Sequence, residues 1–172
     1  AQQNLYIQRN NTPAFIRVSN ELTSKGVIIT DIETAVREHA DLVAQYFMTT
    51  AVKVDEHKLT AYHAALVNGG VFVYVPRNVI VEEPIQVVFV HDNAEASLFN
   101  HVLIVAEQSS AVTYVETYIS TVEEAKGQVN VVTEVIAKDN AQVTFGAVDN
   151  LTTGFTAYMN RRGHVARDAK ID

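Results

Sequence analysis

The spacing of hydrophobic residues along the chain changes near residue 70. Before that point, Asp31 stands in the position of a helix N-cap, and apolar residues at helical spacing predict one helix over residues 32–47. A second helical pattern covers residues 55–67, and the pair Gly69-Gly70 predicts the end of that helix. The residues expected to form the apolar faces are Ile32, Val36, Ala40, Val43 and Phe47 in the first helix and Leu59, Tyr62 and Leu66 in the second.

Almost everything after residue 70 has the β-branched and aromatic residues that are typical of strands, and short strands also precede the first helix. The polar, glycine and proline positions between the apolar runs set their limits. The predicted strands are 5–8, 15–18, 27–30, 71–75, 79–81, 85–91, 101–106, 111–119, 129–137, 142–148, 155–160 and 164–166.

A repeat of about 30 residues runs through the second half. Segments 102–116, 133–148 and 161–172 each contain apolar residues, an alanine, a polar turn and a second alanine, and the second alanines are Ala111, Ala141 and Ala169. Strand–turn–strand units at a constant period indicate a stacked array in which each unit packs against the next. The runs VFVYV and VVFV do not alternate with polar residues, which fits strands covered on both faces.

These patterns predict a mainly β protein: a parallel β-helix core over residues 70–172 that follows a small α/β segment over residues 1–69. An antiparallel sandwich is disfavoured because no Asn-Gly or Asp-Gly pair stands between two predicted strands. A jelly roll of the cupin type stays open, since it too has many short strands. The sequence ends inside the repeat, so we expect a fragment truncated at its C-terminal end.

Composition narrows the class of protein. The chain has 172 residues, of which 48% are hydrophobic, no run long enough to span a bilayer and no signal-peptide pattern, so we expect a soluble, cytoplasmic domain without membrane contact. Without cysteine, this stretch has no disulfides and no thiolate ligands. The net charge of −7 argues against nucleic acid as a partner. The basic residues that cluster, beside Asp168 and Asp172 in a predicted solvated surface, are Arg161, Arg162, Arg167 and Lys170.

The histidines give no metal-binding motif, because no cupin-like pair and no H-E-x-x-H occurs. His91 and His101 flank a predicted turn and could approach one another with Glu95 between them, most simply as a polar pair at a loop. His39 and His63 are expected to be partly buried packing residues on the helices. We therefore predict no metal site.

Carboxylates are the remaining candidates for chemistry. Glu116 and Glu134 each interrupt an apolar strand and could lie on an outward face, which keeps a carbohydrate-active β-helix enzyme open as an alternative. Glu82 and Glu83 are adjacent, and on a strand they would point to opposite faces.

Glu123 and Glu124 are expected in a solvated turn. The strand aromatics are expected in the core; these are Tyr74, Tyr114, Tyr118, Phe145 and Tyr158. No phosphate-binding loop or nucleophile motif is present. We predict no catalytic residue and no enzyme activity, while a cupin-like small-molecule binder remains a further alternative.

Three stretches resemble one known family. They are AALVNGGVFVYVPRNVIVEEPIQVVFV (64–90), VLIVAEQSSAVTYVETYIS (102–120) and VIAKDNAQVTFGAV (135–148). Together they resemble the SufB/SufD family of bacterial iron–sulfur cluster assembly proteins, and the EEPIQVVFV and ETYIS segments fit its SufD branch better.

The resemblance implies a right-handed parallel β-helix that acts as a scaffold with SufB-like and SufC-like subunits, the latter an ATPase. The iron–sulfur cluster would be handled by the full complex, and no cofactor would be bound by this fragment. The family's cluster-chemistry residues and its ATPase-docking helices lie beyond the matched region, so no site residue is carried over. A truncated β-helix would expose the unpaired strand edges of its last turn. We therefore expect the fragment to form a homodimer through that end or through a flat sheet face.

Overall fold

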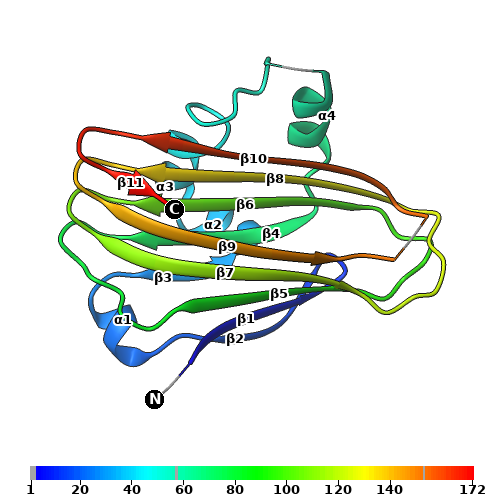
Figure 1. Ribbon diagram of the computed structural model, residues 1–172, viewed down its shortest axis with the longest axis horizontal. Coiled ribbons are helices and arrows are strands. Elements are labelled where there is room, and N and C mark those ends of the chain that lie inside the picture. The colour runs from blue at the N-terminus through cyan, green and yellow to red at the C-terminus, as the bar shows by residue number, and fades with distance from the viewer. Residues whose placement is uncertain (1–2, 57, 153) are drawn as a thin grey trace.

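Two β-sheets face each other and wind into a β-solenoid of about three turns, with about 31 residues in each turn (Figure 1). The computed structural model describes residues 3–56, 58–152 and 154–172, with the backbone alone at 59–62. Sheet A has the order β11-β9-β7-β5-β1-β2 and sheet B the order β10-β8-β6-β4-β3. The strands of sheet A are β1 (Asn4–Arg9), β2 (Thr12–Arg17), β5 (Ile85–His91), β7 (Ala111–Ser120), β9 (Gln142–Asn150) and β11 (Lys170–Ile171). Those of sheet B are β3 (Ile28–Asp31), β4 (Gly69–Val75), β6 (Leu98–Ala106), β8 (Gln128–Ala137) and β10 (Thr156–Val165).

Parallel pairing between successive turns confirms the predicted stacked architecture. The strands β5, β7, β9 and β11 pair in parallel in sheet A, and β4, β6, β8 and β10 do so in sheet B. Antiparallel pairs occur at the N-terminal side, between β1 and β2 and between β3 and β4. Strand β1 pairs in parallel with β5 and so extends sheet A from the first half of the chain. The division of the chain at residues 69 and 70 stays a prediction.

A tight corner recurs where each turn passes from sheet B to sheet A. One residue at each corner has a positive φ between 57° and 64°, and the backbone N–H of three of them donates to a carbonyl of the next corner. Short polar residues adopt this left-handed conformation more readily than β-branched ones, which explains the polar turns of the repeat. The corner residues are Asn78, Ser109, Asn140 and Asp168.

The solenoid has a packed lumen and one covered outer face. Alternate residues of both sheets meet in the lumen, while residues such as Phe72 and Leu103 point outward from sheet B and pack against α2 and α3. The outer face of sheet A is not covered in this way, since Val115 and Val148 are 37% and 56% exposed. The expectation that both apolar runs are covered on both faces is therefore right for VFVYV and wrong for VVFV, of which Val88 and Val90 are only half-buried.

The helices are α1 (Asn20–Ser24), α2 (Ile32–Glu38), α3 (Ala40–Tyr46) and α4 (Lys58–Leu66). Asp31 caps α2 as predicted, accepting a bond from the backbone N–H of Thr34 at 2.9 Å. The single helix predicted over 32–47 is wrong, because His39 leaves helical geometry (φ −131°, ψ 41°) and separates α2 from α3. The break lets both short helices bury residues against sheet B, while Val36 of the expected apolar face is 54% exposed.

Helix α4 departs from its predicted face and end. Leu66 is 39% exposed, and the buried His63 faces the sheet instead. The side chains of Leu59 and Tyr62 lie outside the described residues, as does His57. Gly69 and Gly70 do not end the helix but begin β4, because a backbone this close to its neighbour leaves no room for a Cβ: one built on Gly70 would lie 1.8 Å from the carbonyl oxygen of His101.

Two strand predictions also need correction. Residues 79–81 form no strand but one bridge, between Ile80 and Ala111, because the chain is turning between the sheets there. Residues 155–160 and 164–166 belong to one continuous strand, β10, which Gly163 does not interrupt. Helix α1 lies in a stretch for which no element was predicted.

Candidate functional site

A chain of four hydrogen-bonded polar side chains lies between α4 and the outer face of sheet B. Nδ1 of His63 lies 2.7 Å from Oδ1 of Asn130, and its Nε2 lies 3.1 Å from Nδ1 of His101. His101 Nε2 in turn lies 2.9 Å from Oε1 of Glu134. All four side chains are buried, so their polar atoms depend on partners within the protein.

Strand alternation places these residues on the helix-facing side of sheet B. His101 belongs to β6, and Asn130 and Glu134 belong to β8, where the odd-numbered neighbours face the lumen. The register pairs His101 with Val132 and Leu103 with Glu134, so Glu134 lies diagonally across from His101. The two strands therefore bring together residues that are far apart in the sequence.

Glu134 also holds the segment that connects α3 to α4. Its Oε1 accepts a bond from the backbone N–H of Met48 at 2.7 Å, and its Oε2 accepts one from Val52 at 3.2 Å. A buried carboxylate is stable when hydrogen-bond donors replace its hydration, and here two amides and one ring N–H surround it. The connecting segment is therefore fixed to the sheet by a charge as well as by apolar contacts.

The direction of the bonds determines how many protons the chain holds. With Glu134 ionised, His101 donates from Nε2, and its Nδ1 accepts from His63 Nε2–H. His63 Nδ1 then faces Asn130 Oδ1, which only accepts. The pair is satisfied when His63 carries both ring protons or when the Asn130 amide turns over and presents its unpaired Nδ2. It is also satisfied when His101 instead carries both ring protons and donates from Nδ1 to His63 Nε2, so that His63 donates from Nδ1 to Asn130 Oδ1. The position of the protons is therefore coupled to the orientation of Asn130.

Burial, together with the neighbouring His101, lowers the pKa of His63 to about 4, although the bond to Asn130 acts in the opposite direction. A neutral His63 has one ring proton, which it donates either from Nε2 to His101, with the Asn130 amide turned over, or from Nδ1 to Asn130 Oδ1, with His101 donating from its own Nδ1. Protonation of His63 would place a positive charge in a buried site. Proton uptake by these hydrogen-bonded side chains is therefore coupled to the packing of α4.

A second polar cluster lies on the lumen side of three successive turns, with Glu116 buried, Arg161 half-buried and Asp149 exposed. Neither carboxylate oxygen of Glu116 has a hydrogen-bond partner among the described residues, and its Oε2 lies 3.8 Å from a terminal nitrogen of Arg161. Arg161 makes two hydrogen bonds to Asp149, at 2.8 and 3.0 Å. Burial raises the pKa of Glu116 to about 7, although the positive charge of Arg161 opposes the rise. Glu116 therefore titrates near neutral pH.

A third polar group ties β1 into the lumen. Gln8 accepts bonds from the hydroxyl of Tyr6 at 2.9 Å and from the backbone N–H of Gly70 at 3.0 Å. Its Nε2 donates to Asn100 at 3.0 Å, and Asn100 donates to the hydroxyl of Tyr118 at 2.6 Å. These bonds join residues from four strands, so the first strand is positioned by the solenoid core.

The predicted outward position is wrong for Glu116, whereas Glu134 does point outward from sheet B but is covered by the segment between α3 and α4. Both side chains are fully buried: Glu116 points into the lumen from β7, and Glu134 lies beneath the helices on β8. The carboxylate oxygens of Glu134 are satisfied by backbone amides and His101, whereas those of Glu116 have no hydrogen bond among the described residues, and burial disfavours the ionised form of Glu116 in spite of Arg161. Neither position gives a substrate access from solvent. The two glutamates cannot act on one sugar.

The predicted approach of His91 to His101 is also wrong. His101 bonds to His63 and Glu134, whereas His91 packs edge-on against Phe155 with 4.6 Å between ring centroids. Glu95 lies instead near Lys126, at 3.9 Å. Both histidines are buried on strands because strand alternation, and not the turn between them, decides where they point.

Other predicted residues have mixed outcomes. Glu82 and Glu83 lie in an irregular segment and not on a strand, so both line the same surface groove. Tyr114 and Tyr118 are buried in the core, as predicted. The basic cluster is mostly a solvated surface, as predicted, with Arg167 near Asp168 and Lys170 near Asp172. Arg161 is the exception, since it reaches into the lumen.

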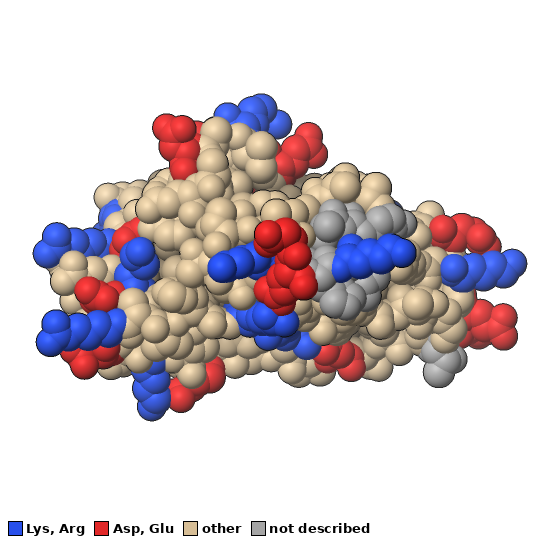
Figure 2. Space-filling model, turned by 90° about the horizontal axis from the view of Figure 1, so that it is seen from above, with Lys and Arg blue, Asp and Glu red and all other residues tan. Residues whose placement is uncertain are grey.

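Seen from above, the molecule has charges of both signs interspersed, with no broad area of one sign on the visible face (Figure 2). In the part of the chain that the structure describes, no group of three or more His, Cys, Asp or Glu side chains is arranged to hold a metal ion. Among the same residues no helix is long and apolar enough to cross a membrane. Close pairs of such side chains, such as His101 and Glu134, are hydrogen-bonded to each other within the wall of the solenoid.

Parallel strands stacked in about three turns, with polar clusters closed inside the wall, define the chain as a β-solenoid protein. Residues 2–87 match the family described as "SufBD protein N-terminal region", and residues 89–172 match "SUF system FeS cluster assembly, SufBD core domain". The chain belongs to the SufBD family.

Individual relatives give the same result. The chain is 63% identical over 169 residues to the "Iron-sulfur cluster assembly protein SufD" of Bacillus subtilis, which covers 98% of this chain and 39% of the relative. It is 28% identical over 165 residues to an "Iron-sulfur cluster assembly SufBD family protein" of Staphylococcus saprophyticus, which covers 96% of this chain and 35% of the relative. The chain thus spans less than half the length of these relatives.

Proposed function

We propose that this chain is part of a SufD-type scaffold subunit in the assembly of iron–sulfur clusters by the SUF system. The observation that carries the proposal is the 63% identity to the Bacillus subtilis SufD protein over nearly the whole chain. Matches to both SufBD family regions support it further. In this proposal the cluster is the cargo of the whole assembly, and the solenoid is a rigid platform.

We expect the subunit to work with SufB-like and SufC-like partners in the cytoplasm and to have no reaction centre of its own in this region. The buried state of Glu116 and Glu134 supports a structural role for them, because neither carboxylate is reached from solvent. The carbohydrate-active alternative is not favoured, since the two glutamates that it needs beside the stacked turns are both closed off from solvent. The cupin-like alternative is not favoured either, because the strands stack in parallel.

A domain exchange tests the proposal. The matching part of the Bacillus subtilis SufD gene is replaced by this chain, the native copy is depleted, and the activity of an iron–sulfur enzyme such as aconitase is measured. We expect the chimera to restore that activity and to co-purify with the SufB-like and SufC-like subunits. The same chimera with Gly70→Ala, which disrupts the fold, is the negative control.

A chimera that accumulates as a folded protein but restores neither enzyme activity nor co-purification would overturn the proposed function. Light scattering on the chain alone checks the separate prediction of a homodimer. A strict monomer at high concentration would contradict that prediction and would leave the scaffold proposal unaffected.

A further inference from the structure

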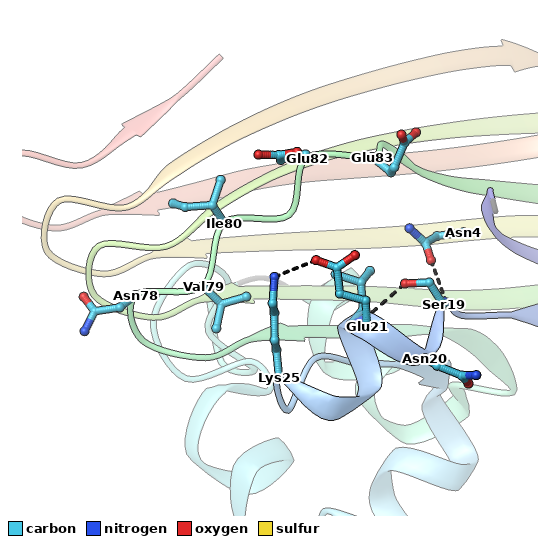
Figure 3. Close-up of a pocket in the computed structure, with 11 residues that line it drawn as sticks. Asn4, Ser19, Asn20, Glu21, Lys25, Asn78, Val79, Ile80, Glu82 and Glu83 are labelled. Atoms are coloured by element: carbon cyan, nitrogen blue, oxygen red, sulfur yellow. Dashed lines mark hydrogen bonds and ion pairs between the residues drawn. The ribbon is translucent and has the colours of Figure 1, made fainter. Parts of the chain in front are cut away.

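A surface groove with a volume of about 810 Å³ lies between helix α1 and the segment that connects β4 to β5 (Figure 3). It is separate from the buried clusters described above. Its size is within the range of about 300–1,000 Å³ that is usual for ligand sites. The groove is lined by Asn4, Ser19, Asn20, Glu21, Leu22, Lys25, Asn78, Val79, Ile80, Glu82 and Glu83.

The groove has an uncompensated negative charge. Lys25 is its one cation among the lining residues, and its Nζ lies 2.8 Å from Oε1 of Glu21. Glu82 and Glu83 are exposed and make no ion pair with any described residue. Figure 3 shows both on the same side of the groove, across from Glu21. Two carboxylates with no cation of their own favour a positively charged occupant.

The groove also presents an apolar surface. Ile80 is 52% exposed and is drawn at the wall of the groove, near the half-buried Val79 (Figure 3). Leu22, which is buried, lies on the side of α1. Ile80 is held in place by its bridge to Ala111, so its exposure follows from the fold and not from a loose loop. An aliphatic group of a partner would gain by covering it.

A buried hydrogen-bond donor is directed into the same space. Asn4 is 1% exposed; its Oδ1 accepts a bond from the backbone N–H of Ser19 at 3.0 Å. Its Nδ2 has no partner among the described residues, and Figure 3 shows this nitrogen turned away from Ser19 towards the open groove. An unpartnered amide N–H that opens from a buried residue towards the groove favours a ligand that supplies a carbonyl oxygen.

From these features we propose that the groove binds a short peptide segment of a partner protein in which lysine or arginine residues stand beside aliphatic ones. The carboxylates of Glu82 and Glu83 match the basic side chains, Ile80 matches an aliphatic side chain, and the free donor of Asn4 matches a backbone carbonyl. A polyamine has no carbonyl and no branched apolar group, and a nucleotide would bring a negative charge towards the carboxylates. The inference does not depend on the proposed function.

Binding of defined probes to the whole chain tests this proposal. The probe is a short fluorescent peptide of alternating lysine and valine with blocked ends, and its anisotropy is measured at physiological salt. We expect the double variant E82Q/E83Q to weaken binding about tenfold, as the loss of two exposed charge pairs would. The matched control is E123Q/E124Q, which removes the same charge from an adjacent, exposed pair elsewhere, and it should change affinity less than twofold.

Two further variants separate the other contacts. Ile80→Ser should weaken binding several-fold, whereas Val148→Ser, at an equally exposed valine on sheet A, should not. Asn4→Asp keeps the acceptor for Ser19 and removes the donor, while its added carboxylate would by itself strengthen binding of the basic probe. A weaker affinity would therefore report the loss of the donor, and an unchanged or higher affinity would count against the carbonyl contact. If circular dichroism shows that Asn4→Asp does not fold, the surface variants decide the outcome.

Several results would overturn the proposal. Equal weakening by E82Q/E83Q and E123Q/E124Q would mean that the probe responds only to net charge. Equal affinity for a lysine–serine peptide would remove the aliphatic contact from the argument, and so would an absence of any effect of Ile80→Ser. Full competition by spermidine at similar concentration would remove the aliphatic and the carbonyl contacts together.

Discussion

Nε2 of His63 on α4 and Nδ1 of His101 on β6 lie 3.1 Å apart, and both rings are buried. Two histidines at this distance share one hydrogen bond comfortably, but two positive rings would repel each other in a site without water. Helix α4 is therefore attached to the sheet by a contact that protonation would weaken. The strength of this attachment can be measured as a function of pH.

Stability should fall as the pH is lowered through the range in which His63 titrates. The pKa of His63 is about 4 in the folded chain against 6.5 for the free side chain, so the unfolded chain binds the proton first. The contribution of His63 is complete above pH 6.5 and is lost progressively down to about pH 4, by about 3 kcal/mol. Chemical denaturation at a series of pH values measures this loss.

His63→Gln keeps a donor for His101 without a titrating ring, and it should flatten this pH dependence. His91, whose pKa burial also lowers, should leave a smaller slope of the same sign. The control His164→Gln changes an exposed histidine and should leave the slope as it is. A slope unchanged in His63→Gln would show that the histidine pair does not couple α4 to pH.

Replacing Glu134 by glutamine should release the segment between α3 and α4. The amide nitrogen of a glutamine would face one of the N–H groups of Met48, Val52 or His101, so a buried donor loses its acceptor. We expect a loss of about 3 kcal/mol in the free energy of unfolding, with faster hydrogen exchange at the amides of Met48 and Val52. The exposed Glu123→Gln should change stability by less than about 0.5 kcal/mol. Unaltered exchange at both amides would contradict the anchoring role of Glu134.

Glu116 should show the opposite dependence on pH. Its pKa is raised from 4.5 to about 7 in the folded chain, so the folded state keeps a proton that the unfolded state has already released. Stability from this group is present below pH 4.5 and is lost as the pH rises through 7. Glu116→Gln, a neutral isostere, should therefore match the parent at pH 4.5 and exceed it by about 2–3 kcal/mol at pH 8. A difference that stays constant with pH would show that Arg161 keeps Glu116 ionised throughout.

Gly70 and Gly146 should respond differently to the same substitution. An alanine at position 70 would need a positive φ of 134° and a Cβ 1.8 Å from the carbonyl oxygen of His101, so Gly70→Ala should cost at least about 3 kcal/mol or prevent folding. At Gly146 a Cβ would meet only the methyl groups of Val115, at 3.8 Å. Gly146→Ala should be neutral or slightly stabilising. Soluble yield and thermal unfolding distinguish the two, and equal behaviour would contradict the role assigned to Gly70.

The stacked architecture could be predicted because its signal is local. A polar turn followed by a small residue must recur wherever the chain makes the same tight corner, and Ala141 and Ala169 do follow aligned corners. Ala111 stands one position further along, beside Gln142, so the predicted period was nearly but not fully in register. The repeat could be detected in spite of this shift, because the apolar strands on either side of each corner recur with the same period.

The sites could not be predicted because their partners are distant. A glutamate in an apolar strand is usually turned to solvent. Glu134 is satisfied inside only by the backbone of a connecting segment that is distant in the sequence, and Glu116 is buried opposite the later Arg161. The break at His39 was hidden by helical periodicity that continues through it. Gly69 and Gly70 resemble a helix end until the approach of β6 is known.

The connections between the two sheets have a constant length on one side of the solenoid and a variable length on the opposite side. At the tight corners the same number of residues separates Ala106 from Ala111, Ala137 from Gln142 and Val165 from Lys170. The connections at the opposite end vary, and the one between β9 and β10 is shorter than the one between β7 and β8 (Figure 1). Insertions, tags or grafted loops should therefore be accepted at that variable end, whereas a single added residue at a corner would shift one whole turn out of step with its neighbours.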